Sequence, residues 1–178
     1  FTYEKEFSYR LESGKRLFIE FEGVNSSSTV SFNGVTLGIH NGGYSTFRFD
    51  VTELVKDENK IEVKVDNSPN DYVYPERADF TFYGGIYRDV YLIETDDVHF
   101  PLLSNGGPGV KVYTQVEDGV GVLSFSSECN GDECVLEIGG DEYHFPVING
   151  VLEGSVRIES VHLWDGKRDP YLYPLTFS

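Results

Sequence analysis

The sequence predicts an all-β fold, arranged as two β-sandwich domains in one chain. Apolar and polar residues alternate with a period of two along much of the 178 residues, as in FTYEKEFSYRL at 1–11 and KIEVKVD at 60–66. This alternation is typical of strands that bury one face. Asn-Gly pairs, the strongest short hairpin signal, occur at 33–34, 41–42, 105–106, 130–131 and 149–150. No long amphipathic helix is encoded, and DVTELVK at 50–56 predicts only one short helical turn, capped by Thr52.

The two domains are predicted to meet near residue 97. RDVYLIETDDVHFPL, at 88–102, contains a strand that ends in acidic residues, followed by a proline that marks the start of new structure. The first domain, 1–97, has long strands and many aromatic residues. The second, 98–178, has about the size of an immunoglobulin-like sandwich or slightly less, against a usual length of ~100 residues.

The acidic composition excludes two classes of partner. With 14 Lys and Arg against 30 Asp and Glu, the formal net charge is −16. This charge repels polyanions, so we expect no nucleic acid and no membrane surface as partner, whereas neutral polyols such as sugars stay open. The chain also has no methionine, which suggests a processed product or an excised piece of a longer protein.

The sequence predicts no metal site, no cofactor and no catalytic residue in this chain, because no set of residues in it makes a catalytic centre. None of the four histidines has the spacing of metal ligands, and we expect them at the surface or on edge strands. Cys129 and Cys134 flank four turn-like residues. The two cysteines either form a disulfide across a hairpin or remain reduced thiols on its surface, and the sequence leaves both readings open.

One long segment without alternation, SPNDYVYPERADFTFYGG at 68–85, lies between two predicted strands. Loops of this length in a compact domain are uncommon and often functional. Its aromatic and charged residues are Tyr72, Tyr74, Phe80, Phe82 and Tyr83, with Asp71, Glu76, Arg77 and Asp79. Aromatic faces stack on sugars, and carboxylates accept hydrogen bonds from hydroxyl groups. We expect the aromatic residues as a group to close the open end of the sandwich, and Asp79 alone to have a binding role.

A combination of short motifs resembles the amino-terminal sugar-binding jelly-roll domain of family 2 glycoside hydrolases, which include β-galactosidases, β-glucuronidases and β-mannosidases. The motifs are FEGV at 21–24, V-x-F-N-G at 30–34, G-G-Y-x-x-F at 42–47, F-D-V-T at 49–52 and G-I-Y-R-D-V at 85–90. The segment VHLWDGKRDPYLYPLTF, at 161–177, resembles the immunoglobulin-like domain that follows in this family. The resemblance therefore implies a galactose-binding-like jelly roll followed by a smaller, truncated immunoglobulin-like sandwich. The local motifs look closest to bacterial β-galactosidases.

The resemblance also implies what this chain lacks. Family members carry their acid/base and nucleophile glutamates on a third domain, a TIM barrel, with the acid/base in an Asn-Glu pair, and Asn-Glu does not occur here. We therefore expect a non-catalytic part of a hydrolase of terminal β-glycosides, whose partner is the catalytic barrel of the same polypeptide. The parent enzyme could form a homo-oligomer. Its compartment, bacterial cytoplasm or periplasm and secretion, is not fixed by the sequence.

Asp79 is the substrate-binding residue that the resemblance implies. An aspartate in its position, seven residues before the isoleucine of G-I-x-R, contacts sugar hydroxyls in the family and in some β-galactosidases helps to hold a monovalent cation. The expected ligand is a β-galactoside-like carbohydrate. Arg88 is expected to be structural and ion-paired, and Trp164 and Tyr171 to close the second sandwich. A stand-alone carbohydrate-binding module and a purely structural scaffold are the alternatives.

Overall fold

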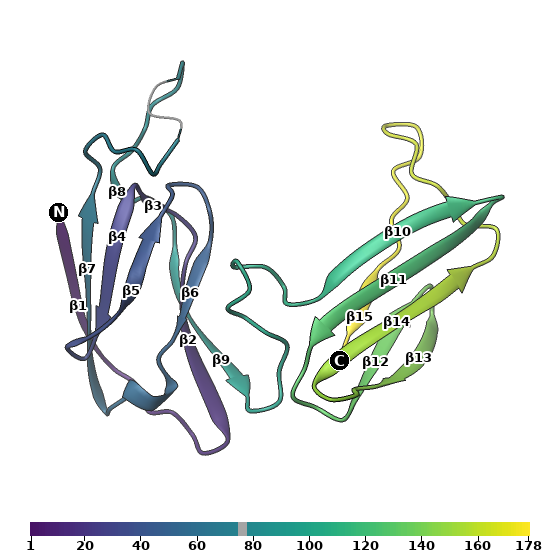
Figure 1. The fold of residues 1–178 in the computed structure, drawn as a ribbon, viewed down its shortest axis with the longest axis horizontal. Helices are drawn as coiled ribbons and strands as arrows, with labels where there is room; N and C mark the ends of the chain where they lie inside the picture. Colours follow the sequence, from purple (N-terminus) through teal and green to yellow (C-terminus); the bar gives the residue numbers. More distant parts are fainter. Residues whose placement is uncertain (75–77) are drawn as a thin grey trace. The chain divides into compact units, whose positions relative to one another are not determined.

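The computed structural model describes residues 1–74 and 78–178, and this part of the chain is all-β, as predicted. It divides into two compact units (Figure 1). Unit 1 comprises Phe1–Asp97 and Leu102–Gly107, and unit 2 comprises Val98–Pro101 and Pro108–Ser178. The division differs from a single boundary after residue 97 in one segment, Leu102–Gly107. Within the described residues, no helix is long and apolar enough to cross a membrane.

Unit 1 is a sandwich of two antiparallel sheets. One sheet has the order β1 (Thr2–Ser8), β7 (Glu58–Asp66), β4 (Ser27–Phe32) and β5 (Val35–Asn41). The other has the order β6 (Phe47–Asp50), β2 (Lys15–Phe21) and β9 (Val90–Asp96), and β3 (Val24–Asn25) pairs with β8 (Gly85–Ile86). The alternation in β7 has the predicted effect, because Ile61, Val63 and Val65 are buried in the core and their neighbours are not.

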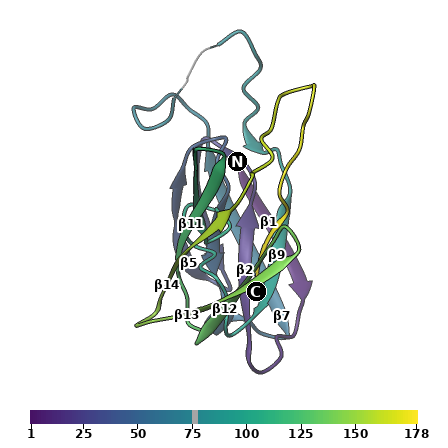
Figure 2. The ribbon, with the colours of Figure 1, turned by 90° about the vertical axis from the view of Figure 1, so that its right-hand side faces the viewer.

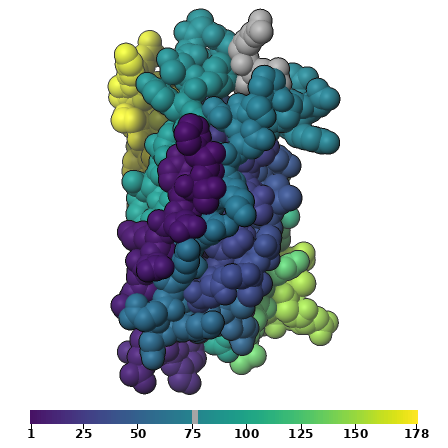
Figure 3. Space-filling view, turned by 90° about the vertical axis from the view of Figure 1, so that its left-hand side faces the viewer, coloured from purple at the N-terminus to yellow at the C-terminus, as the bar shows by residue number. Residues whose placement is uncertain are grey.

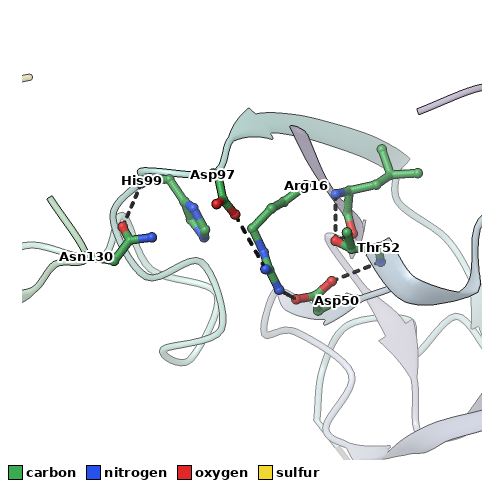
Figure 4. A network of polar contacts seen from close by, with 7 residues as sticks. Arg16, Asp50, Thr52, Asp97, His99 and Asn130 are labelled. Atoms are coloured by element: carbon green, nitrogen blue, oxygen red, sulfur yellow. Dashed lines mark hydrogen bonds and ion pairs between the residues drawn. The ribbon is translucent and has the colours of Figure 1, made fainter. Parts of the chain in front are cut away.

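The turns of unit 1 follow part of the predicted pattern. Asn33 and Gly34 close the β4–β5 hairpin with φ values of +50° and +82°, the left-handed conformations that a two-residue type I′ turn requires. The predicted helical turn is the 3-10 helix η1 (Thr52–Leu54), but Thr52 does not cap it. Instead, Asp50 Oδ1 accepts a hydrogen bond of 2.9 Å from the Thr52 amide, and Thr52 Oγ1 accepts one from Leu17 N (Figure 4).

Arg48, in β6, binds the segment Leu102–Gly107 to unit 1. Its Nη1 donates to the carbonyl oxygens of Leu102 at 2.9 Å and Gly107 at 2.8 Å, while its Nε donates to Glu20 Oε2 at 2.5 Å. Both charged side chains of this pair are only 12% exposed. Within the segment, Gly106 has φ +64° and lies so close to β6 that a Cβ atom there would be 2.3 Å from Thr46 O. We call Leu102–Gly107 the strap.

Unit 2 is a second sandwich of two three-stranded antiparallel sheets. Their orders are β10 (Lys111–Glu117), β11 (Val120–Glu128) and β14 (Val151–Ile158), and β13 (Asp141–Pro146), β12 (Glu133–Ile138) and β15 (Leu175–Phe177). Phe125, Leu136 and Leu152 lie in the core between them. The expectation that Trp164 closes this sandwich is wrong, because its side chain is 63% exposed. Tyr171 is also exposed and stacks on His162 with ring centroids 4.1 Å apart.

The two cysteines do not face each other across a hairpin, because β11 and β12 belong to different sheets. Both thiols are free: Cys129 is half-buried after β11, and Cys134 is completely buried in the core of unit 2. The surface-hairpin alternative is therefore wrong for Cys134, although its thiol is reduced. Burial raises the pKa of the Cys134 thiol, which lowers the fraction of reactive thiolate.

We expect the two thiols to react at very different rates with an aromatic disulfide reagent at pH 8. Cys129 should be modified within minutes in the native protein, and Cys134 only after unfolding in guanidinium, because its thiolate is both scarce and inaccessible. The measurement is the release of the coloured thiolate over time. In Cys129→Ser the fast phase should vanish. Equal rates for both thiols in the native protein would contradict the burial of Cys134.

Candidate functional site

The described parts of the segment between β7 and β8, residues 67–74 and 78–84, project beyond the strands at one end of unit 1 (Figures 1 and 2). The space-filling view shows its side chains gathered at that end (Figure 3). Glu76 and Arg77, singled out in the sequence, lie outside the described residues together with Pro75. The rest of the segment carries Asp79 and the aromatic residues, and we call residues 67–74 and 78–84 the site loop.

Asp79 is exposed to solvent on the site loop. Among the residues that the structure describes, none forms a hydrogen bond or ion pair with its carboxylate. Other carboxylates of unit 1 are used internally: Glu20 pairs with Arg48, and Asp50 pairs with Arg16 at 2.5 Å (Figure 4). No described residue occupies the acceptor sites of the Asp79 carboxylate, whereas those of Glu20 and Asp50 are partly used by the framework.

Four aromatic rings form a cluster beside Asp79. Tyr44, in the turn between β5 and β6, lies edge-on to Phe80, Phe82 and Tyr87 with ring centroids 6.2–6.4 Å apart. Phe80 and Phe82 also contact each other, at 4.7 Å. Such tilted and edge-on pairs are favourable arrangements of aromatic rings. The cluster fixes the part of the site loop that directly follows Asp79, and sequence reasoning found its members only one at a time.

The carboxyl end of the site loop is also held by polar contacts. Asn25, 8% exposed, donates from Nδ2 to Tyr83 O at 2.9 Å. The two glycines that follow are required by close packing: a Cβ on Gly84 would be 2.3 Å from Asn67 Nδ2, and one on Gly85, where φ is +88°, would be 2.2 Å from the Tyr3 hydroxyl. The double glycine thus lets the chain pass between two side chains and enter β8.

The expectation that the loop's aromatic residues close the end of the sandwich is wrong for most of them. Tyr72, Tyr74, Phe80 and Tyr83 are all exposed, Tyr72 by 80%. The buried residue of this stretch is Val73, whose amide donates to Asn70 Oδ1 at 3.1 Å. The site loop therefore presents aromatic surface to solvent.

Arg88 follows β8 at a bend and has a different role from the predicted one. Its guanidinium lies over the ring of Tyr87, 5.4 Å from the centroid, and it forms no ion pair with any residue in the described ranges. The predicted ion pairing is therefore wrong, and the contact is a cation–π interaction. Through this contact Arg88 supports Tyr87, whose hydroxyl donates to Gly43 O.

The described part of the chain contains no metal-binding arrangement. In residues 1–74 and 78–178, no group of three or more His, Cys, Asp and Glu side chains could hold a metal ion. His40 is instead part of the framework: its ring stacks on Phe47 at 3.9 Å, and Ser45 Oγ lies 3.2 Å from its Nε2. Burial lowers the pKa of His40. The chemistry that the described site can supply is thus hydrogen bonding by a carboxylate and stacking by exposed rings.

Comparison with known proteins identifies the class. The family model described as glycosyl hydrolases family 2, sugar binding domain, matches residues 2–96. The chain belongs to this family, and unit 1 carries the sugar-binding domain. The resemblance inferred from the sequence motifs is confirmed.

The individual relatives include both a β-glucuronidase and a β-galactosidase. The chain is 34% identical to a β-glucuronidase of Bacteroides fragilis over an alignment 197 positions long, gaps included, which covers 99% of this chain and 28% of the relative. It is 36% identical to a β-galactosidase of Thermoanaerobacter pseudethanolicus over 125 residues, 67% of this chain and 16% of the relative. The chain therefore spans less than a third of the length of these curated relatives.

Solved structures show the same fold over nearly the whole chain. An FMN-binding β-glucuronidase from Faecalibacterium prausnitzii L2-6 superposes with a TM-score of 0.86 and 31% identity, covering 98% of this chain and 29% of that one. β-Glucuronidase 2 of Bacteroides uniformis gives 0.83 and 27%, covering 99% and 24%. The similarity thus extends through both units and confirms the predicted fold class.

Proposed function

We propose that this chain is the non-catalytic sugar-binding part of a family 2 hydrolase that cleaves terminal β-glycosides. Its site loop forms one wall of the substrate pocket, and unit 1 buttresses the catalytic barrel of the same polypeptide. The observation that carries the proposal is Asp79: its exposed carboxylate has no partner among the described residues and stands next to the anchored ring cluster.

The proposed role of Asp79 is to orient the sugar. An ionised carboxylate accepts hydrogen bonds from two hydroxyl groups and so fixes the sugar ring relative to catalytic groups. The reaction itself is retaining hydrolysis, in which two carboxylates of the barrel act as acid/base and nucleophile. A neutral, β-galactoside-like substrate fits better than a uronate, because Asp79 and the net charge of −16 both repel an anionic sugar.

The test compares the 178-residue chain with the protein encoded by the complete reading frame around it. Both are assayed with nitrophenyl β-D-galactoside and nitrophenyl β-D-glucuronide. The chain alone should release no nitrophenol above the buffer rate, whereas the complete protein should turn over one substrate, the galactoside by preference. Turnover by the chain alone, or a complete reading frame without hydrolase activity, would contradict the proposal. Preference for the glucuronide would correct the substrate and keep the reaction class.

A stand-alone carbohydrate-binding module is the second candidate. The observation that favours it is the exposure of Tyr72, Tyr74 and Tyr83, which belong to the same loop as Asp79, since exposed rings are the usual platform for a sugar face. Titration of the isolated chain with galactose or a galactan separates the two functions. Saturable binding that is lost in Asp79→Ala would support the module, and absence of binding would leave the hydrolase part as the function.

A further inference from the structure

We infer that Tyr44 is the residue that positions Asp79, an inference that rests on the proposed function of Asp79 as a sugar contact. Tyr44 lies in the turn between β5 and β6, far from the site loop in sequence. Its ring is nevertheless 6.4 Å from Phe80 and 6.4 Å from Phe82, measured between centroids. Phe80 is the residue that directly follows Asp79, so the placement of its ring sets the course of the backbone at Asp79.

Tyr44 is the shared neighbour of the ring cluster. It contacts Phe80, Phe82 and Tyr87 at interplanar angles of 75°, 68° and 66°, so all three rings meet it edge-on. Phe80 and Phe82 contact each other, but among the described residues neither ring contacts Tyr87. Removal of Tyr44 would therefore disconnect the two rings of the site loop from Tyr87, which belongs to the framework next to β8.

The turn that carries Tyr44 is itself fixed. The hydroxyl of Tyr87 donates to Gly43 O, and Gly43 packs so closely on Asn25 that a Cβ there would be 2.7 Å from its Oδ1. Asn25 in turn donates to Tyr83 O. The turn and the end of the site loop are thus tied to the same buried asparagine. Tyr44 is the ring that extends this rigid base to the residues around Asp79.

Tyr44 contacts the rings next to Asp79 and does not belong to the buried core. Its side chain is 42% exposed, so its loss leaves the sandwich packing intact. A displacement of a binding group by about 1 Å can cost 100-fold in rate. We expect Tyr44→Ala to lower kcat/KM of the complete hydrolase by about 10- to 100-fold through the displacement of Asp79. Tyr44→Phe keeps the ring and should behave like the wild type.

A double-mutant cycle in the complete hydrolase tests this inference. Asp79→Ala, Tyr44→Ala and the double variant are compared with Tyr91→Ala, which removes an exposed tyrosine of β9 as a control. If Tyr44 acts through Asp79, Tyr44→Ala causes no further loss in the Asp79→Ala background. Equal losses in both backgrounds would mean that Tyr44 contacts the sugar directly, and would overturn the inference.

Limited proteolysis of the 178-residue chain provides a readout that does not depend on activity. In Tyr44→Ala, chymotrypsin should cleave after Phe80 and Phe82 at least about tenfold faster than in the wild type, while Tyr44→Phe and Tyr91→Ala leave this rate unchanged. An unchanged cleavage rate in Tyr44→Ala would overturn the inference. If Asp79→Ala has no kinetic effect while cleavage accelerates in Tyr44→Ala, the proposed function of Asp79 fails and the ordering role of Tyr44 stands.

Discussion

Asp79→Ala in the complete hydrolase is expected to lower kcat/KM for a nitrophenyl β-glycoside by at least about 100-fold. A hydrogen bond to a charged group contributes about 1.5–3 kcal/mol, and loss of two such bonds corresponds to about 3–6 kcal/mol. Each 1.4 kcal/mol is a factor of about ten in rate. Asp79 has no partner among the described residues, so its removal should leave the stability of the chain unchanged. The measurement is steady-state kinetics together with thermal unfolding.

Two further variants sharpen this test. Asp79→Asn keeps the size of the side chain but removes the charge and one acceptor, so it should lose nearly as much activity as the alanine variant. Asp71→Ala removes another exposed carboxylate of the same loop and should retain activity within about threefold. An unchanged kcat/KM in Asp79→Ala would assign the chain a scaffold role. Equal losses in Asp71→Ala would point to a general effect of loop charge.

Arg48→Met is expected to cause the largest loss of stability, about 3 kcal/mol in the free energy of unfolding. The substitution leaves the carboxylate of Glu20 without its partner at a position that is 12% exposed. It also removes both donors to the strap, at Leu102 O and Gly107 O. The strap amides should then exchange faster. Urea unfolding by far-UV circular dichroism measures the loss, with the fluorescence of the single tryptophan, Trp164, reporting on unit 2.

Arg16→Met is the matched control for Arg48→Met. Arg16 also pairs with an aspartate at 2.5 Å, but its side chain is 32% exposed and that of Asp50 is 26% exposed. Such a pair contributes at most about 1 kcal/mol. The double variant Arg48→Met with Glu20→Leu should be more stable than Arg48→Met alone, because it leaves no unpaired buried charge. If Arg48→Met and Arg16→Met destabilise equally, burial does not decide the strength of the Arg48 pair.

The features that could be predicted from the sequence are those set by local patterns. The alternation in 60–66 identified β7 and its buried face, and Asn33-Gly34 identified the β4–β5 hairpin. The segment LFIEF at 17–21 has the same alternation, yet β2 is buried on both faces. Glu20 can lie inside because Arg48, in a neighbouring strand, neutralises it. No local sequence pattern contains this partner, so the burial of Glu20 could not be predicted from the sequence.

The candidate site shows the same limit. The length of the site loop and the position of Asp79 could be recognised from the sequence, because a break in alternation and a motif are local features. The ring cluster could not, since it joins Tyr44 to residues more than thirty positions away. The signal present in the sequence is G-G-Y at 42–44, which is recognisable there only as part of a family motif. The exposure of Tyr72 and Tyr74 was missed because aromatic residues in a loop are more often buried.

The strap has a consequence for exchanging modules between related hydrolases. The chain passes from one unit to the other after Asp97, after Pro101 and after Gly107. If two related genes were joined after Asp97, Arg48 would come from one parent and the strap from the other. The strap's carbonyl groups and its glycine would then face a β6 with which they did not evolve. A point after Gly107 would instead separate Phe100 from the core that it packs against in unit 2. A single crossover therefore cannot exchange one unit and leave the contacts of the other intact. Residues 98–107 must come from a parent whose sequence fits both units.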